Sequence, residues 1–357
     1  MNKNTNERRL DEIVSAVEPS SRIFFESAQK RWDSLAKPLG ALGVLETDVC
    51  TLASCAQSLF PKIDRRVLAV FCADNGIVSE GVSQSGQDVT TAVVKSLCDG
   101  KSSACTIARS VRCEVVPVDI GVSQKVSSKN LVSLCVRRGT RNFLEEDAMS
   151  REECAHAILH GIDLADKLSK DFDILLAGEM GIGNTTTSSA LLSVFLSLDP
   201  KETTGKGAGL SDSALFHKID VIRRGIERRK PQKDDALDSL SKLGGFDIAG
   251  MAGFFIGAAK NNHAAIVDGL IAQCAAIVAV KICPAVRSFL IASHESAEKA
   301  SVAALSFLNL DAAIHAQFHL GEGTGALSLL PLLDLALEAY KSLPSFEKIG
   351  IEPYKAL

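Results

Sequence analysis

The sequence predicts an α/β fold built on a parallel, doubly wound sheet. Two observations lead to this class. Short apolar runs of strand length recur along the 357 residues, and most of them end at Gly, Asp or Ser and lead into a helical pattern. Runs without polar alternation are typical of strands buried on both faces, and strand–helix alternation is typical of parallel sheets. The runs are 67–73, 113–118, 131–136, 173–177, 264–267 and 286–292.

The composition is that of an ordinary globular protein, with 46% hydrophobic and 23% charged residues. A net charge of −4 argues against nucleic acid as the main partner. The first residues contain no apolar segment of a signal peptide, and the longest apolar stretch, 275–280, is too short to span a bilayer. Ten cysteines lie scattered without any C-x-x-C pair, as in a reducing compartment. We therefore expect a cytoplasmic protein with no membrane contact.

Residues 1–60 have a helical pattern. Ile13, Val14 and Val17 form one apolar stripe, a second helix covers 23–35 before Pro38, and an amphipathic helix follows over 44–59. A helical cap, a dimer surface or direct ligand contact would each suit this region.

The first strand, 67–73, is followed by Asp74-Asn75-Gly76 and by a polar loop over 80–91. Loops at the carboxyl ends of strands bind ligands in α/β proteins, although a simple turn also explains this composition. A helix around 93–97 and the strands 113–118 and 131–136 come next. Ser150 to Glu153 then form a capping box, which predicts a helix that reaches about Leu168.

The stretch 173–196 carries the strongest local signal for a ligand. A strand at 173–177 is followed by a loop with Gly178, Gly181 and Gly183, and oxygens over 184–187 are suited to cap the next helix. Backbone N–H groups and the helix dipole there favour an anion, most often a phosphate, over the alternative of a mere tight turn. The spacing matches neither the Walker A loop nor the dinucleotide-binding motif. Glu179 would repel a phosphate, so it is better suited to a sugar hydroxyl.

The second half continues the alternation with a glycine loop at 205–209, a basic helix at 215–229 and a polar connection at 230–235. Gly250, Gly253 and Gly257 leave one helical face nearly bare, which would pack closely on a sheet. The strand 264–267 precedes Asp268-Gly269 and a helix that ends near Lys281. The last strand, 286–292, is expected to lead through a cap at 293–296 into the next helix.

Three short patterns near the C-terminus allow more than one interpretation. If 315–322 is helical, His315, His319 and Glu322 share one face in a credible zinc geometry, although Gly321 and Gly323 favour an earlier end and a structural histidine pair. Ser296-x-x-Lys299 formally matches an acyl-enzyme nucleophile box but suits a helix cap better. Glu322 lies among glycines, so it is either a general base in a water-excluded site or a turn glutamate in solvent.

Six ordered motifs together resemble the nicotinate-nucleotide–dimethylbenzimidazole phosphoribosyltransferase family. The resemblance covers about residues 25–340, and six motifs in one order are highly specific. The motifs are KPLGALG (37–43), CADNG…EGVS (72–83), GEMGIGNTT (178–186), GGFDIAGM (244–251), SHESAEK (293–299) and LGEGTGA (320–326).

The resemblance implies a fold and a set of roles. It implies a Rossmann-like catalytic domain over 61–326, a small helical domain formed by 1–60 and 327–357, and a homodimer. Glu322 would be the general base, and Ser85 and Leu320 would line the pocket of the incoming base. The mononucleotide would be held by the remaining assigned residues, which are Glu179, Gly181, Gly183, Lys218 and Ser296.

The implied reaction moves the 5-phosphoribosyl group of nicotinate mononucleotide to 5,6-dimethylbenzimidazole, giving α-ribazole 5′-phosphate and nicotinate for the nucleotide loop of cobamides. No cofactor or metal is expected, because nicotinate leaves as a neutral pyridine. Asn75, Val93 and Thr324 depart from the family pattern, so adenine, other benzimidazoles or phenols also stay open as the base. A metal-dependent hydrolase and a non-catalytic nucleotide-binding module are the alternatives.

Overall fold

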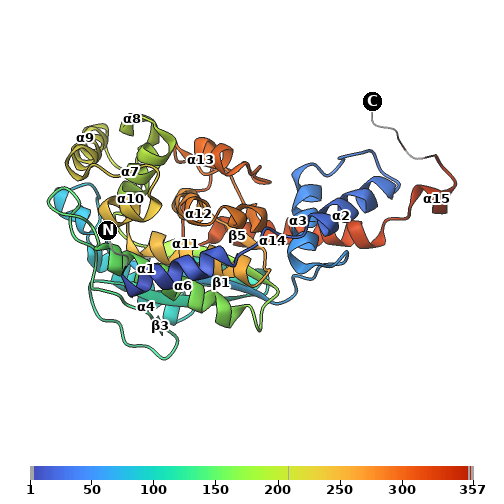
Figure 1. The fold of residues 1–357 in the computed structure, drawn as a ribbon, viewed down its shortest axis with the longest axis horizontal. Helices are drawn as coiled ribbons and strands as arrows, with labels where there is room; N and C mark the ends of the chain where they lie inside the picture. Colours follow the sequence, from blue (N-terminus) through green and yellow to red (C-terminus); the bar gives the residue numbers. More distant parts are fainter. Residues whose placement is uncertain (1–3, 208, 353, 355–357) are drawn as a thin grey trace.

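The computed structural model describes residues 4–207, 209–352 and 354, and its centre is one parallel sheet of six strands (Figure 1). Residue 208 of the predicted loop and the remaining terminal residues of the two helical ranges lie outside the described part. The strand order is β3-β2-β1-β4-β5-β6, which is the order of a doubly wound Rossmann fold. The strands are β1 (Arg66–Ala73), β2 (Cys113–Gly121), β3 (Val132–Ser133), β4 (Ile174–Met180), β5 (Ala265–Val267) and β6 (Leu290–Ala292).

The register of the strands brings their carboxyl ends to one edge. Cys72 pairs with Met180, Ala177 with Val267, and Val267 with Ala292. The residues that follow β4, β5 and β6 therefore come together beside the point where the strand order reverses, between β1 and β4, which is where doubly wound sheets bind ligands.

Helices cover both faces of the sheet (Figure 1). As a result, every residue of β1 and nearly all of β4 are buried. In chain order the main helices are α4 (Gln87–Cys98), α5 (Ser103–Ser110), α6 (Arg151–Leu168), α7 (Asn184–Leu196), α9 (Asp212–Arg229), α10 (Ala236–Leu243), α11 (Phe246–Lys260), α12 (Leu270–Ile282) and α13 (Ser301–Leu308). Shorter elements are η1 (Gly76–Glu80), α8 (Pro200–Thr203), η2 (Pro284–Phe289) and α15 (Phe346–Ile349).

Most predicted elements are confirmed, including the capping box at Ser150 and Glu153. Four are corrected. The strand predicted over 173–177 runs to Met180, so Gly178 lies in β4 and not in the loop that follows it. In the strand predicted over 286–292, the residues as far as Phe289 belong to a 3₁₀ helix that begins at Pro284, and only Leu290–Ala292 form a strand. The strand predicted over 131–136 keeps only two paired residues at the sheet edge. The helix predicted to start at the 293–296 cap begins at Ser301 instead, and α5 was not predicted.

The face of α11 that carries Gly250, Gly253 and Gly257 packs mainly on helix α6 rather than on the sheet. A Cβ at Gly253 would overlap the backbone of Ile158 in α6, and one at Gly257 would touch Ala165 of the same helix. Of the three glycines only Gly250 faces the sheet, where it meets Phe71. Close approach of α11 and α6 therefore requires these positions to lack side chains.

Segments from both ends of the chain lie together at one end of the molecule, where α2 (Arg22–Ser34), α3 (Val44–Ala56) and the outer part of α14 (Thr324–Ser342) pack side by side (Figure 1). α1 (Thr5–Ser15) is different, since it lies along α6 on the large part, with Arg151 of α6 paired to Glu7. Apart from α1, the predicted division into a small helical domain (1–60 and 327–357) and a catalytic domain (61–326) stays a proposal. Within the described residues, no helix combines the length and the apolar character needed to cross a bilayer.

Candidate active site

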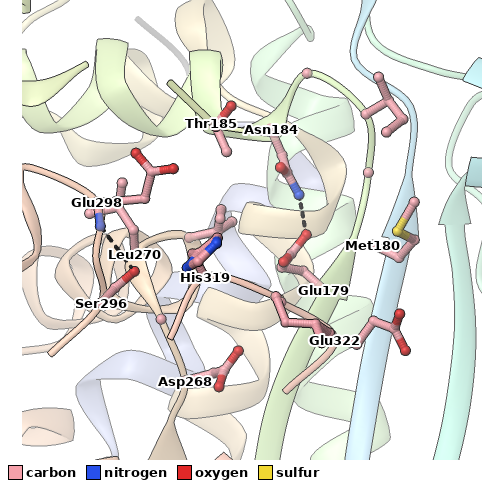
Figure 2. A pocket seen from close by; sticks show the side chains of 18 of the residues that line it. Glu179, Met180, Asn184, Thr185, Asp268, Leu270, Ser296, Glu298, His319 and Glu322 are labelled. Atoms are coloured by element: carbon pink, nitrogen blue, oxygen red, sulfur yellow. Dashed lines mark hydrogen bonds between the residues drawn. The ribbon is translucent and has the colours of Figure 1, made fainter. Parts of the chain in front are cut away.

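A cavity of about 240 Å³ lies at the carboxyl edge of the sheet, where the ends of β4, β5 and β6 meet the N-termini of α7, α12 and α14 (Figure 2). One end of it is lined by Ser296, Glu298 and Leu270, and the other by Glu179, Met180 and Glu322. Asn184 and Thr185 lie along a third side. The cavity therefore has a polar end with helix N-termini and a second end with two carboxylates.

Glu179 is buried and held by an amide. Its Oε2 accepts a hydrogen bond from Nδ2 of Asn184, which also donates to Asp247 Oδ2 at 3.1 Å (Figure 2). Burial, with the nearby charge of Asp247, raises the pKa of Glu179 to about 8, and burial raises the pKa of Asp247 to about 6. Asn184 was predicted to cap α7, but its amide is committed to these two carboxyl groups and the N-cap is Gly183.

Glu322 lies on a tightly fixed loop before α14. Its φ is 55°, its backbone N–H donates to the Glu179 carbonyl at 3.2 Å, and its Oε2 accepts from the Ala104 N–H at 3.0 Å. Ala104 is in the first turn of α5, so the helix dipole stabilises the carboxylate there. A Cβ on Gly178 of β4 would lie 2.5 Å from the Gly323 nitrogen, so this loop approaches the strand too closely for any other residue.

Asp268 and His294 fix the other side of the same loop. Asp268 directly follows β5, and its Oδ1 accepts from the Ala326 N–H at 2.9 Å in the first turn of α14. A Cβ on Gly325 would overlap the His294 ring and lie 2.8 Å from Asp268 Oδ1. The start of α14, and with it Glu322, is therefore held between β4 and this Asp–His pair.

Lys218 is the buried cation of the cavity. It projects from α9, is 1% exposed, and donates to Thr185 Oγ1 at 2.8 Å. Burial lowers the pKa of Lys218 to about 8, opposed by the negative charge of Glu298. Thr185 lies in the first turn of α7, so an anion next to it would meet the lysine and the N–H groups of a helix N-terminus together.

The structure brings together nearly all residues that the resemblance assigns. Ser85 differs, because it lies on the loop after η1 beside Gln84 and Ser83, which line the cavity, while Ser85 itself does not reach the lining. The assigned residues that line the cavity are Glu179, Gly181, Gly183, Lys218, Ser296, Leu320 and Glu322.

The helix that the zinc interpretation required is not formed. The described residues 309–323 contain no helix, and His315 pairs with Glu295 at 3.2 Å outside the cavity that His319 and Glu322 line. Across the described part of the chain, no group of three His, Cys, Asp or Glu side chains is placed to hold a metal ion.

Sequence reasoning gave no role to several residues that shape the site. Asp247, Asp268, His294 and Glu298 are all in this group, although three of them fall within or beside quoted motifs. What could have identified them is their position at the carboxyl edge of the sheet, since Asp268 and His294 follow strands and Asp247 lies at the start of a helix there. Which residues share that edge depends on the strand order, which the sequence does not show.

Comparisons with known proteins agree with this geometry. A family model described as "Phosphoribosyltransferase" matches residues 17–351. The chain is 38% identical over 349 residues to a nicotinate-nucleotide–dimethylbenzimidazole phosphoribosyltransferase of Ruminiclostridium cellulolyticum, covering 98% of this chain and 99% of the relative. It is 40% identical over 331 residues to the protein of the same name from Acetivibrio thermocellus, covering 92% and 94%.

A solved structure also matches. The crystal structure of CobT from Thermus thermophilus has a TM-score of 0.88 and 32% identity to this chain, and the match covers 93% of this chain and 100% of that one.

Proposed function

This chain belongs to the nicotinate-nucleotide–dimethylbenzimidazole phosphoribosyltransferase family, and from that premise we propose that it transfers the phosphoribosyl group of nicotinate mononucleotide to 5,6-dimethylbenzimidazole or a related base. The observation that carries the proposal is one cavity with a buried cation and helix N-termini at its polar end and two carboxyl groups at the other. We also propose that the protein acts in the cytoplasm, which its ten unpaired cysteines support.

The reaction exchanges one C–N bond for another. The bond from C1′ to nicotinate breaks, nicotinate leaves as a neutral pyridine, and C1′ bonds to the lone-pair nitrogen of the incoming base. The N–H proton of that base passes to Glu322, whose Oε2 accepts the Ala104 N–H at the start of α5. Glu179 would contact the ribose near C1′, and its carboxyl group would stabilise positive charge there once ionised.

The polar end of the cavity would bind the phosphoribosyl donor, nicotinate mononucleotide. Lys218, Thr185 and Ser296 surround a space next to the N-terminus of α7, which suits the 5′-phosphate. Positioning both reactants within one cavity supplies much of the rate enhancement in a reaction that needs no metal to activate its leaving group. Leu320 and Met180 supply apolar surface for the planar base, and Gly181 and Gly183 let the backbone approach the mononucleotide.

The direct test is release of nicotinate from nicotinate mononucleotide with a panel of benzimidazoles, adenine and phenols. We expect release that depends on a base and is unaffected by a strong chelator. Loss of turnover on chelation, restored by one metal equivalent, would favour the hydrolase alternative, and no release with any base would favour a nucleotide-binding module.

A homodimer is part of the proposal. Apolar side chains on the end formed by α2, α3 and α14 are exposed, notably Ile23 at 76% and Leu335 at 67%. A second copy would cover such residues, and sedimentation at micromolar concentration would then give a mass twice that of the chain.

A further inference from the structure

His294 is a buried histidine with one nitrogen left free toward the cavity. It follows β6 and is only 3% exposed. Its Nδ1 lies 2.9 Å from Ser293 Oγ, and that hydroxyl donates its single proton to the Val267 carbonyl at 2.8 Å. The hydroxyl can therefore only accept from the ring, so Nδ1 carries the hydrogen and Nε2 has the lone pair when the ring is neutral.

The surroundings of Nε2 are those of an anion site. Within the described residues, Nε2 makes no hydrogen bond, and a Cβ on Gly269 would lie 3.3 Å from it and 3.8 Å from the Ser296 Cβ. Gly269 is the N-cap of α12 and has no side chain to satisfy the N–H groups of the first turn. The imidazole nitrogen, the Ser296 side chain and a helix N-terminus thus lie close together in the cavity, and the Ser296 hydroxyl donates to the Phe318 carbonyl at 3.2 Å.

The charges around this place favour proton uptake when an anion binds. The cavity lining holds four carboxyl groups but only two lysines, and Asp268 Oδ1 lies 3.9 Å from His294 Nδ1. Burial lowers the pKa of His294, and Asp268 only partly opposes this, so the ring is neutral in the empty cavity. A phosphate at Nε2 would add a second negative neighbour and favour the imidazolium.

We propose that His294 is a proton-linked phosphate ligand, which takes a proton from solvent at Nε2 when the mononucleotide binds and donates it in a hydrogen bond to the 5′-phosphate. This inference rests on the proposed function, because it assumes that nicotinate mononucleotide enters this cavity. Asp268 balances the new charge from the Nδ1 side, so the imidazolium lies between two anions. The other titratable groups facing the cavity are Glu179, Lys206, Lys218, Glu298, His319 and Glu322.

Calorimetry measures this uptake directly. Binding heats for nicotinate mononucleotide at pH 7.5, in two buffers of different ionisation enthalpy, give the number of protons taken up. At this pH the phosphate is already mostly dianionic and Lys218, with a pKa of about 8, is mostly charged. We expect a clear uptake, approaching one proton, with the mononucleotide and much less with nicotinate riboside, which lacks the phosphate.

Two variants separate the roles of the ring nitrogens. His294→Asn keeps an amide near Ser293 and removes the end at Nε2, whereas His294→Gln places a neutral donor near the position of Nε2. We expect His294→Asn to weaken mononucleotide binding on the order of 10- to 100-fold with little effect on the riboside. His294→Gln should weaken it less, and both should lose most of the uptake, leaving only the smaller part that Lys218 takes up. His315→Asn, which alters a histidine outside this cavity, should change neither quantity.

Three results would overturn the inference. One is equal proton uptake with mononucleotide and riboside in the wild type, which decides the matter even if the variants do not fold. Another is unchanged uptake in His294→Asn, and the third is equal weakening of both ligands, as a purely structural role requires. Mononucleotide binding without any effect of His294 would leave the proposed function intact, whereas no binding at all would end both.

Discussion

Glu179 and Glu322 are carboxyl groups of one cavity in opposite environments. Glu179 is buried beside Asp247, which raises its pKa to about 8, whereas Glu322 accepts a backbone N–H at the start of α5. Carboxyl groups in such different surroundings are suited to different roles in one reaction. Burial favours the protonated form of Glu179, which makes it less suited to accept a proton and supports the assignment of Glu322 as the base.

Glu322→Gln keeps the shape of the side chain and removes its ability to accept a proton. A positioned base contributes on the order of 10²- to 10⁴-fold, so we expect kcat to fall by that factor while both substrates still bind. Steady-state kinetics with nicotinate mononucleotide and dimethylbenzimidazole measure this. Glu179→Gln is the matched control, and near-normal kcat in Glu322→Gln with loss in Glu179→Gln would exchange the two roles.

Lys218→Ala should weaken binding more than it slows the bound complex. A lysine on a fixed phosphate interacts equally in the ground and transition states, so KM for the mononucleotide carries most of the loss. In the wild type, affinity should also fall as pH rises above about 8, where Lys218 loses its proton. A fall in kcat alone would place the lysine at the reacting carbon.

At the scale of the elements, the N-terminus of α14 and the packing of α11 depend on glycines for different reasons. Gly325 is wedged against the Asp268–His294 pair, and Gly253 lies against the α6 backbone far from the cavity. The first contact positions Glu322, while the second only joins two helices.

Gly325→Ala and Gly253→Ala should therefore differ in what they damage. Gly325→Ala shifts the loop that carries Glu322, and a displacement of about 1 Å can cost about 10²-fold in rate. Gly253→Ala forces α11 and α6 apart and should cost about 1–3 kcal/mol of stability, with kcat unchanged where the protein is folded. Thermal melting and kinetics on both variants measure this, and a normal kcat in Gly325→Ala would show that the loop tolerates the shift.

For the whole molecule, buried carboxyl groups link stability to pH. Burial raises the pKa of Glu179 and Asp48 to about 8. Because the unfolded value of Glu179 is near 4.5, the folded chain binds more protons between about 4.5 and 8, and stability falls as pH rises through that interval.

We therefore expect a lower melting temperature at pH 8.5 than at pH 6 for the ligand-free protein. Glu179→Gln removes one of the titrating groups and should make the difference smaller, while the exposed Glu12→Gln should not. A melting temperature that rises over this interval in the wild type would contradict the raised values. Calorimetric scans at the two pH values give the comparison.

Local patterns in the chain were enough to predict the fold class and to point to most residues of the candidate site. Apolar runs identify buried strands because no polar residue is tolerated on either face, and the glycine-rich stretch over 178–183 predicts an anion site because backbone N–H groups need no side chain. The six motifs identified the family, which the comparisons confirm. Short-range signals such as the Ser150 capping box were also right, since both partners lie within one turn.

Contacts between distant segments account for the features that local patterns missed. Asn184 is predicted to cap a helix, but its amide instead joins Glu179 to Asp247, which lies 63 residues away in the chain. Asp268 and His294 join the site because β5 and β6 end at the same edge as β4. Such pairings follow from strand order, whereas the sequence shows each residue only among its neighbours in the chain. The free Nε2 of His294 is therefore visible only in the folded chain.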